Sequence, residues 1–330
     1  MSPAPATSTT MAKAINSALA DAMTEDDRVV VFGEDVGALG GVFRVTDGLT
    51  QKFGEERCFD TPLAEASIMG TAIGMAVYGF KPVVEMQFDA FAYPALEQVI
   101  SHLAKMRNRT RGAVPMPVVV RIPYGGGIGG VEHHSDSSEA YFAHTPGLHV
   151  VTPATVADAY SLMREAIDSP DPVIFFEPKR LYWSKAEVAL PARTGGIGTA
   201  AVRRAGTDAT LVCYGQTVPV CLAAAELAQR EGRQLEVLDL RSLVPLDENA
   251  IVASVEKTGR AIVVHESTGF AGFGAELAAK IAERCFYRLE APVARVSGLD
   301  IPFPPPKYEH WYLPDADRVL DAVDRALAAG

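Results

Sequence analysis

Short apolar runs rich in β-branched residues alternate, in the first half of the chain, with longer segments whose apolar residues recur at helical spacing. The runs predict strands at residues 28–36, 81–88, 117–125, 148–154 and 171–178, and the longer segments predict helices at residues 65–79, 94–109 and 155–169. Thr155 and Asp158 stand where a capping pair would start the last of these helices. This alternation is typical of βαβ units, so we expect a mostly parallel sheet with helices on both faces.

The alternation lapses between about residues 179 and 208 and then resumes. Strands are predicted at residues 209–215, 235–246, 261–267 and 294–298, helices at residues 220–232, 248–259 and 275–286, and a last helix after the proline-rich passage at residues 300–310. We therefore expect an α/β protein of two domains. The predicted division is a disordered tail at residues 1–10, a first domain at 11–190, a linker at 191–207 and a second domain at 208–330.

The composition excludes several classes of function. The net charge of −11 argues against a nucleic-acid partner, which needs a basic face, and the one basic run, at residues 105–112, is interpreted as a solvated helix end. No 18 consecutive apolar residues occur, so no membrane-spanning segment is expected. The four cysteines have neither disulfide-framework nor metal-site spacing, which favours a reducing compartment and predicts a cytoplasmic protein.

The segment GGGIGGVEHHSDSS, which begins at Gly125, raises three alternatives. Its glycines fit the dinucleotide pattern G-x-G-x-x-G, but they lead into polar, turn-like residues instead of a helix, which disfavours a nicotinamide cofactor. A metal site on His133 and His134 is also disfavoured, because adjacent residues of an extended chain point to opposite sides. The third alternative is a single histidine that acts as an acid–base group, since histidine titrates near neutral pH.

Glu65 is the second unusual feature, because it opens an almost wholly apolar predicted helix and the next charge along the chain is Lys81. A carboxylate at the start of a helix can simply be favoured by the helix dipole. The apolar setting adds a second interpretation, since burial disfavours a carboxylate that has no partner. Glu65 is therefore expected to have a polar partner, such as a ring nitrogen of a heterocycle.

From about residue 11 to its end, the chain resembles the beta subunits of thiamine diphosphate-dependent 2-oxo acid dehydrogenases. Five long motifs carry the resemblance in the same order, at residues 33–49, 60–88, 133–155, 171–183 and 289–304. The segments VEHHSDSSEAYFAHTPG, ERCFYRLEAP and RVSGLDIPFP make the branched-chain 2-oxo acid dehydrogenase type the most similar. The resemblance implies a pyrimidine-binding first domain and a second domain like the C-terminal domain of transketolase.

The resemblance also implies a set of site residues. Glu65, in the motif DTPLAE, is expected to hydrogen-bond a ring nitrogen of the cofactor's aminopyrimidine, and Phe91 is expected to pack on that ring. Leu63 and Gln87 are expected beside the same ring. His134 matches the family's active-site histidine in the pattern H-S-x-S-x-E-A, and is expected to orient or protonate the acyl intermediate and to help pass the acyl group to lipoamide.

A complete enzyme of this kind holds Mg²⁺ and the diphosphate with a G-D-G motif that ends in N-N, and this sequence contains neither element. The resemblance therefore implies half an active site for thiamine diphosphate, with Mg²⁺ held by a separate alpha subunit. The expected assembly is a heterotetramer of two alpha and two beta subunits, within a complex that contains a lipoyl acyltransferase and a dihydrolipoamide dehydrogenase. The implied reaction is oxidative decarboxylation of branched-chain 2-oxo acids, such as 3-methyl-2-oxobutanoate, with reductive acylation of lipoamide.

Two further features follow from the resemblance. Relatives bind a structural monovalent cation mainly through backbone carbonyls, and the matching positions for potassium here are Val118, Val119, Ala166, Ser169 and Asp171. Ala166 and Ser169 depart from the usual residues, although carbonyl ligation depends little on the side chain. In some relatives the position of Glu34 belongs to a relay of carboxylates between the active sites of the tetramer.

Other functions stay open from the sequence. A pyruvate or acetoin dehydrogenase would use the same chemistry, because a beta chain alone does not build the whole substrate pocket. A nicotinamide-dependent oxidoreductase and a non-catalytic scaffold that docks the acyltransferase are the two further alternatives. Binding of NAD⁺ by the isolated chain would support the oxidoreductase.

Overall fold

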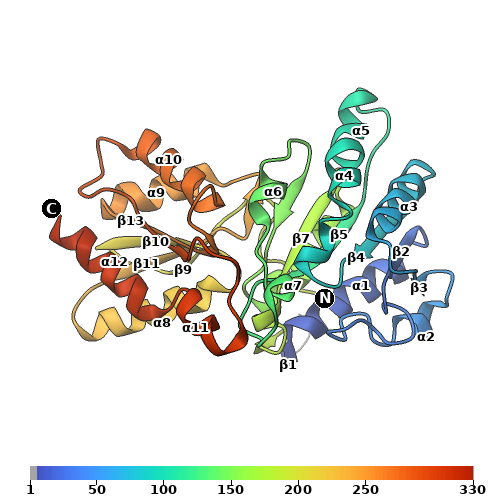
Figure 1. The fold of residues 1–330 in the computed structure, drawn as a ribbon, viewed down its shortest axis with the longest axis horizontal. Coiled ribbons are helices and arrows are strands. Elements are labelled where there is room, and N and C mark those ends of the chain that lie inside the picture. The colour runs from blue at the N-terminus through green and yellow to red at the C-terminus, as the bar shows by residue number, and fades with distance from the viewer. Residues whose placement is uncertain (1–5, 330) are drawn as a thin grey trace.

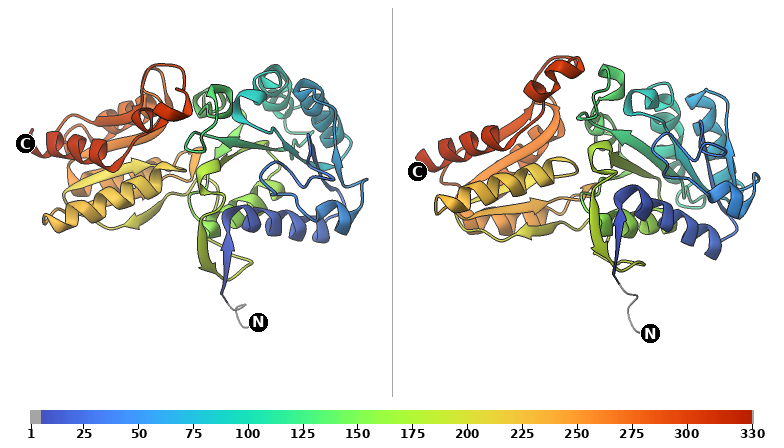
Figure 2. Two further views of the ribbon diagram at one scale, coloured as in Figure 1. Left: turned by 60° about the horizontal axis from the view of Figure 1, so that its bottom comes forward. Right: turned by 90° about the horizontal axis from the view of Figure 1, so that it is seen from below.

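The computed structural model describes residues 6–329, which form two α/β halves that lie side by side (Figure 1). The first half runs from blue to yellow-green in the figure, and the second from yellow to red. Two further views show how helices cover the sheet in each half (Figure 2). Most strand pairings in both sheets are parallel, which confirms the fold class expected from the alternating pattern.

The first half is built on a seven-stranded sheet in the order β12-β6-β7-β5-β4-β2-β3. Its strands are β2 (Val29–Gly33), β3 (Cys58–Asp60), β4 (Lys81–Glu85), β5 (Val119–Tyr124), β6 (His149–Val151), β7 (Val173–Pro178) and β12 (Ser242–Val244). β12 runs antiparallel to β6, and the other neighbours are parallel. β2, β5 and β7 are buried along their whole length, which explains their continuous apolar runs.

Two layers of helices bury opposite faces of this sheet. α1 (Met11–Glu25) and α7 (Val156–Asp168) pack on the face to which Val29 and Val31 of β2 contribute, whereas α3 (Glu65–Val77) packs on the face of Val30 and Phe32. The predicted capping pair is present at the start of α7, where Thr155 Oγ1 accepts a hydrogen bond from Asp158 N. The remaining helices of this half are α2 (Leu49–Phe53), α4 (Leu96–Gln98), α5 (Ala104–Arg109) and α6 (Glu139–Ala143), with a π-helical turn at Val99–Leu103 between α4 and α5.

The second half has a five-stranded sheet in the order β14-β13-β10-β11-β9. Its strands are β9 (Ala201–Arg204), β10 (Ala209–Cys213), β11 (Leu235–Asp239), β13 (Ala261–Thr268) and β14 (Ala294–Gly298). β9 is antiparallel to β11, and the other pairings are parallel. The helices of this half are α8 (Thr217–Arg230), α9 (Glu248–Thr258), α10 (Phe273–Cys285), α11 (Glu309–Tyr312) and α12 (Ala316–Ala328).

Three predictions from the sequence need correction. Part of the tail predicted to be disordered forms strand β1 (Thr7–Thr10), which pairs antiparallel with β8 (Lys185–Val188); residues 1–5 of that tail lie outside the described residues. The predicted linker contains β9, whose polar edge position hid the strand pattern. The strand predicted at residues 235–246 is two strands, because the chain turns at Arg241, which has a φ of 56°, and β12 then joins the sheet of the other half.

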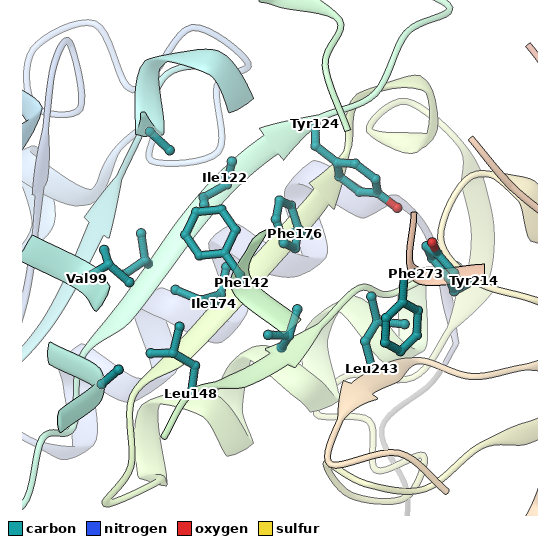
Figure 3. Close-up of a cluster of buried hydrophobic side chains, with 14 of the residues drawn as sticks. Val99, Ile122, Tyr124, Phe142, Leu148, Ile174, Phe176, Tyr214, Leu243 and Phe273 are labelled. Atoms are coloured by element: carbon teal, nitrogen blue, oxygen red, sulfur yellow. The ribbon is translucent and has the colours of Figure 1, made fainter. Parts of the chain in front are cut away.

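A shared apolar cluster joins the two halves (Figure 3). Phe142 and Phe176 from the first half and Tyr214 and Phe273 from the second are buried members of it, and so is Leu243 of β12, the strand that joins the first sheet. Burial of large aromatic side chains from both halves stabilises their relative position. Residues of the second half can therefore support a site that is built on the first.

All four cysteines are buried, and none forms a disulfide within the described chain. Among residues 6–329, no helix has both the length and the apolar character needed to cross a membrane.

Candidate active site

The predicted site residues lie just beyond the carboxyl ends of strands in the first sheet. Glu34 follows β2, Glu65 follows β3, Gln87 and Phe91 follow β4, and His134 follows β5. Parallel α/β sheets commonly bind ligands at this edge, because the loops that leave successive strands meet there. The topology therefore gathers on one edge residues that are far apart in the sequence.

Glu65 and Glu34 form a pair of buried carboxylates. Glu65 begins α3 and is 9% exposed, so its carboxylate is largely removed from water. Burial raises the pKa of Glu34, and the negative charges of Glu65 and Asp35 raise it further. Within residues 6–329, Glu34 Oε1 is buried without a hydrogen-bond partner. A buried carboxyl oxygen without a partner indicates a place where a group from outside this chain can donate.

Gln87 is tied to this pair. Its Nε2 atom donates a hydrogen bond to Asp35 Oδ2 (2.8 Å) and lies 3.5 Å from the backbone oxygen of Glu34. Leu63, two residues before Glu65, has a side chain that is 79% exposed. The structure therefore places Gln87 against Asp35 and the backbone of Glu34, and leaves Leu63 exposed near Glu65.

Exposed apolar side chains continue along the same edge of the sheet. They come from the loops that follow β2, β3 and β5, and they are Leu39, Val42, Leu63, Ile128 and Val131. Several apolar side chains on neighbouring loops are characteristic of a surface that another molecule covers. The site is thus open to solvent on the side formed by the loops after β2, β3 and β5.

Phe91 and His134 are in direct contact. Phe91 lies on a short 3₁₀ turn (Asp89–Ala92), His134 lies on another (Glu132–His134), and their ring centroids are 5.4 Å apart. Both rings also pack edge-to-face on Phe88, with centroid distances of 5.6 Å for Phe91 and 4.4 Å for His134. Phe91, predicted to pack on the ring, and His134, predicted to act in acyl transfer, are thus neighbours, although they lie on loops that follow different strands.

A buried lysine that no sequence motif points to lies next to this aromatic group. Lys179 follows β7, is 1% exposed, and has its Nζ atom 5.6 Å from the centroid of the Phe88 ring. Burial lowers the pKa of Lys179. Burial also lowers the pKa of His134, and His133 and Lys179 lower it further. His134 is therefore mainly neutral at pH 7, so one ring nitrogen can donate and the other can accept a proton.

Two carboxylates, one in the segment after His134 and one on the turn that carries Phe91, connect these two parts of the chain. Asp89 accepts hydrogen bonds from the backbone N (2.7 Å) and from Oγ (2.5 Å) of Ser138. Asp136 accepts a hydrogen bond from the hydroxyl of Tyr93 (3.0 Å). Burial raises the pKa of both carboxyl groups. These contacts join the turn that carries Phe91 to the segment next to His134.

A buried ion-pair network lies within the strands that support this edge. Arg121 of β5 donates to Glu85 of β4 (2.5 Å) and makes a two-pronged contact with Glu177 of β7 (2.7 and 2.9 Å). The hydroxyl of Tyr182 donates to the same Glu177 carboxylate. The network therefore links three adjacent strands; its only sequence signal is a charge within each of three apolar runs.

The positions predicted for potassium are partly brought together. Ser169 Oγ donates to the backbone oxygen of Asp171 (2.9 Å), and the backbone N–H of Ser169 donates to the backbone oxygen of Ala166 (3.3 Å). Val118 and Val119 lie on the neighbouring segment at the start of β5, and the carbonyl of Val118 accepts a backbone hydrogen bond from β7 (2.9 Å). Each of these carbonyls has a second lone pair, so the donor set fits a monovalent cation. The potassium site stays a prediction.

A cavity of about 540 Å³ opens between the two halves, next to the segment that follows His134. Its lining includes Ser135 and Asp136 from the first half and Thr268 and Phe303 from the second. Glu65 and Phe91 are not among the residues that line this cavity.

The donor set at the carboxyl edge suits a planar ring that contains nitrogen atoms. A buried carboxylate such as Glu65 can share a proton with a ring nitrogen, and an aromatic side chain such as Phe91 can pack on the face of the ring. His134 adds an acid–base group beside Phe91.

Comparison with known protein families divides the chain in the same way as its fold. Residues 7–184 match the family described as "Transketolase, pyrimidine binding domain". Residues 198–319 match the family described as "Transketolase, C-terminal domain".

Two curated relatives are similar over almost the whole chain. The chain is 57% identical to the 3-methyl-2-oxobutanoate dehydrogenase subunit beta of Mycobacterium tuberculosis, over 97% of this chain and 92% of that protein. It is 56% identical to the pyruvate dehydrogenase E1 component subunit beta of Leifsonia xyli, over 96% of this chain and 94% of that protein.

Among solved structures, a split-gene transketolase in an inactive tetramer of beta chains has a TM-score of 0.81 with this chain at 24% identity, and the match covers 99% of both chains. This likeness supports the fold.

Proposed function

The chain belongs to the beta subunits of the thiamine diphosphate-dependent 2-oxo acid dehydrogenases, oxidoreductases with lipoamide as acceptor, and from this premise we propose that its substrates are branched-chain 2-oxo acids. The reaction is the oxidative decarboxylation of 3-methyl-2-oxobutanoate and similar acids, followed by reductive acylation of lipoamide. An alpha subunit takes part in both steps.

One observation carries the proposed active site: the contact between Phe91 and His134 lies at the same sheet edge as the buried carboxylates Glu34 and Glu65. Thiamine diphosphate, when bound, supplies the electron sink that decarboxylation of a 2-oxo acid requires. In this proposal Glu65 hydrogen-bonds a ring nitrogen of the aminopyrimidine, and Phe91 packs on the ring. Gln87 and Leu63 flank the same ring.

His134 holds or delivers a proton when the acyl group passes to lipoamide. Its lowered pKa leaves the imidazole mainly neutral at pH 7, and makes the protonated form a ready donor. The contacts with Phe88 and Phe91 fix the plane of the imidazole, so that its nitrogen atoms face a defined direction.

The alpha subunit completes the site. The exposed apolar side chains on the loops after β2, β3 and β5 support this, because a partner that covers them also closes the open side of the site. The alpha subunit holds Mg²⁺ and the diphosphate, and two copies of each chain form the heterotetramer. Association with a lipoyl acyltransferase, and a cytoplasmic location, belong to the same proposal.

Pyruvate is the second candidate substrate. The chain is 56% identical to a pyruvate dehydrogenase beta subunit and 57% identical to a branched-chain one, so overall similarity does not separate the two. The motifs at residues 131–147 and 283–304 favour the branched-chain type.

The test is a comparison of substrates in the assembled enzyme. The chain is co-purified with its alpha subunit and supplied with thiamine diphosphate and Mg²⁺, and decarboxylation is followed with an artificial electron acceptor. We expect a higher kcat/KM for 3-methyl-2-oxobutanoate and 4-methyl-2-oxopentanoate than for pyruvate. A higher kcat/KM for pyruvate would contradict the proposed substrate class.

A further inference from the structure

The loop that leads to His134 is held in place by the second half of the chain. It runs from Gly125, just after β5, to Val131, just before the short turn that carries His134. Five of its seven residues are glycine, so the loop has little conformational preference of its own. Contacts from outside the loop must therefore determine its path, and with it the position of the imidazole.

Glu266 makes the shortest hydrogen bond to this loop. Glu266 lies on β13 and is 3% exposed, and its Oε1 atom accepts a hydrogen bond from Gly126 N (2.5 Å). A Cβ atom at Gly126 would overlap the Phe303 ring, so the backbone there is confined between two groups of the second half. Glu309 accepts longer hydrogen bonds (3.3 Å) from the backbone N–H groups of residues 127 and 129.

Arg180 orients the other side of the Glu266 carboxylate. Its Nη2 atom lies 3.4 Å from Glu266 Oε2. The Arg180 side chain also fills the space beside Gly127, whose φ of +85° favours glycine. The Glu266 carboxylate is thus held between a cation and the loop, in a setting from which water is nearly excluded.

We propose that Glu266 is a positioning residue for His134, and that it acts through its hydrogen bond to Gly126. This inference rests on the proposed role of His134 in acyl transfer. Glu266 fixes the path of residues 125–131, and so sets where the imidazole lies beside Phe91. A displacement of about 1 Å in such a group is enough to lower a rate by roughly a hundredfold.

The test uses two variants of Glu266 in the enzyme assembled with its alpha subunit. Glu266→Asp keeps the charge that faces Arg180, but withdraws the carboxylate from Gly126 by about 1.5 Å, one carbon–carbon bond. Glu266→Gln keeps an oxygen acceptor within reach of Gly126 and removes the charge. Both variants fill most of the buried space, which an alanine would leave empty. Glu256→Asp, at an exposed position on α9, is the matched control.

Two rates are compared for each variant: reductive acylation of a free lipoyl domain, and decarboxylation with an artificial electron acceptor. We expect Glu266→Asp to lower acylation roughly tenfold, because a buried N–H loses its acceptor, and to change decarboxylation less than about twofold, as a local effect on one group would. Glu266→Gln keeps both rates within about threefold of the wild type, since its oxygen still accepts. Equal losses in both rates, or a loss in Glu266→Gln as large as that in Glu266→Asp, would overturn the inference.

The His134→Ala background separates the inference from the proposed function. If Glu266 acts through His134, then Glu266→Asp lowers acylation no further once His134 is absent. A full tenfold loss in that background would show that Glu266 acts elsewhere. If His134→Ala alone leaves acylation unchanged, the proposed role of His134 fails. If His134→Ala abolishes acylation while Glu266→Asp has no effect, only the positioning role fails.

Discussion

Replacement of Arg121 tests how the strands under the site are held. Arg121→Met removes three charge-assisted hydrogen bonds to two buried carboxylates, Glu85 and Glu177. Breaking a buried ion pair from one side costs about 3–5 kcal/mol, because the remaining charge is left without compensation. The alternative, protonating one freed carboxyl at pH 7, costs about 3.5 kcal/mol, so both routes give a loss of similar size.

The assay is urea unfolding of the chain followed by circular dichroism, at pH 7 and at pH 5. In the variant Glu85 keeps the burial that raises its pKa and loses the Arg121 cation that lowers it, so the folded state gains stability as pH falls. At pH 5 the cost of protonating one carboxyl is only about 1 kcal/mol, so we expect the loss caused by Arg121→Met to shrink by about 2.5 kcal/mol. Further replacement, Glu177→Gln in the same chain, should recover part of the loss at pH 7, because it removes one of the unpaired charges.

The matched control is Arg325→Met, which breaks an exposed pair between Arg325 and Asp321 on α12 and should leave the urea midpoint unchanged. A loss of less than about 1 kcal/mol for Arg121→Met at pH 7 would refute the reasoning. A loss that does not depend on pH would also contradict it, because the cost would then not come from freed carboxylates.

Three further predictions concern the site and its surroundings. His134→Ala in the assembled enzyme should lower the rate of reductive acylation of the lipoyl domain by about 10²–10⁴-fold. It should lower the rate of decarboxylation with an artificial electron acceptor far less. Equal losses in the two rates would mean that His134 acts before acyl transfer. Burial raises the pKa of Glu139 from 4.5 to about 8, so the stability contributed by its protonated form is fully present below pH 4.5 and is lost as pH rises through 8. Glu139→Gln should therefore flatten the fall of the urea midpoint between pH 5 and pH 8. An unchanged slope would show that Glu139 does not cause this fall. Exchange of potassium for lithium in the buffer should lower the midpoint of thermal unfolding of the wild-type chain. An unchanged midpoint would contradict the predicted potassium site.

The sequence was sufficient to predict the two α/β domains, because strands buried on both faces and amphipathic helices leave strong periodic signals. It was weakest at the edges of the sheets. Residues 7–10 and β9 are short and partly exposed, so their polar residues give no strand pattern until a partner strand is known. β12 could not be separated from β11 by pattern, because nothing local shows that it pairs in the sheet of the other half.

The residues of the candidate site also fall into those that the sequence predicts and those that it does not. Glu65, Phe91 and His134 were found because each lies in a motif, and the structure places them at one edge of one sheet. Lys179 was missed, since a lysine after a buried strand is ordinarily a surface residue. Glu266 was missed because its partner, Gly126, is 140 positions away in the sequence. Long-range contacts of this kind carry no local signal, although they determine where a glycine-rich loop lies.

The measurement that tests the central claim most directly is decarboxylation of 3-methyl-2-oxobutanoate by the chain alone, by its alpha subunit alone and by an equimolar mixture, all with thiamine diphosphate and Mg²⁺. The mixture is prepared with the wild-type chain and with Glu65→Gln, and assembly is checked by analytical ultracentrifugation. The account predicts activity only in the wild-type mixture, and loss of that activity in Glu65→Gln although the heterotetramer still forms. Activity of the chain alone, or full activity of the Glu65→Gln mixture, would contradict the claim that this chain supplies half of the active site through Glu65.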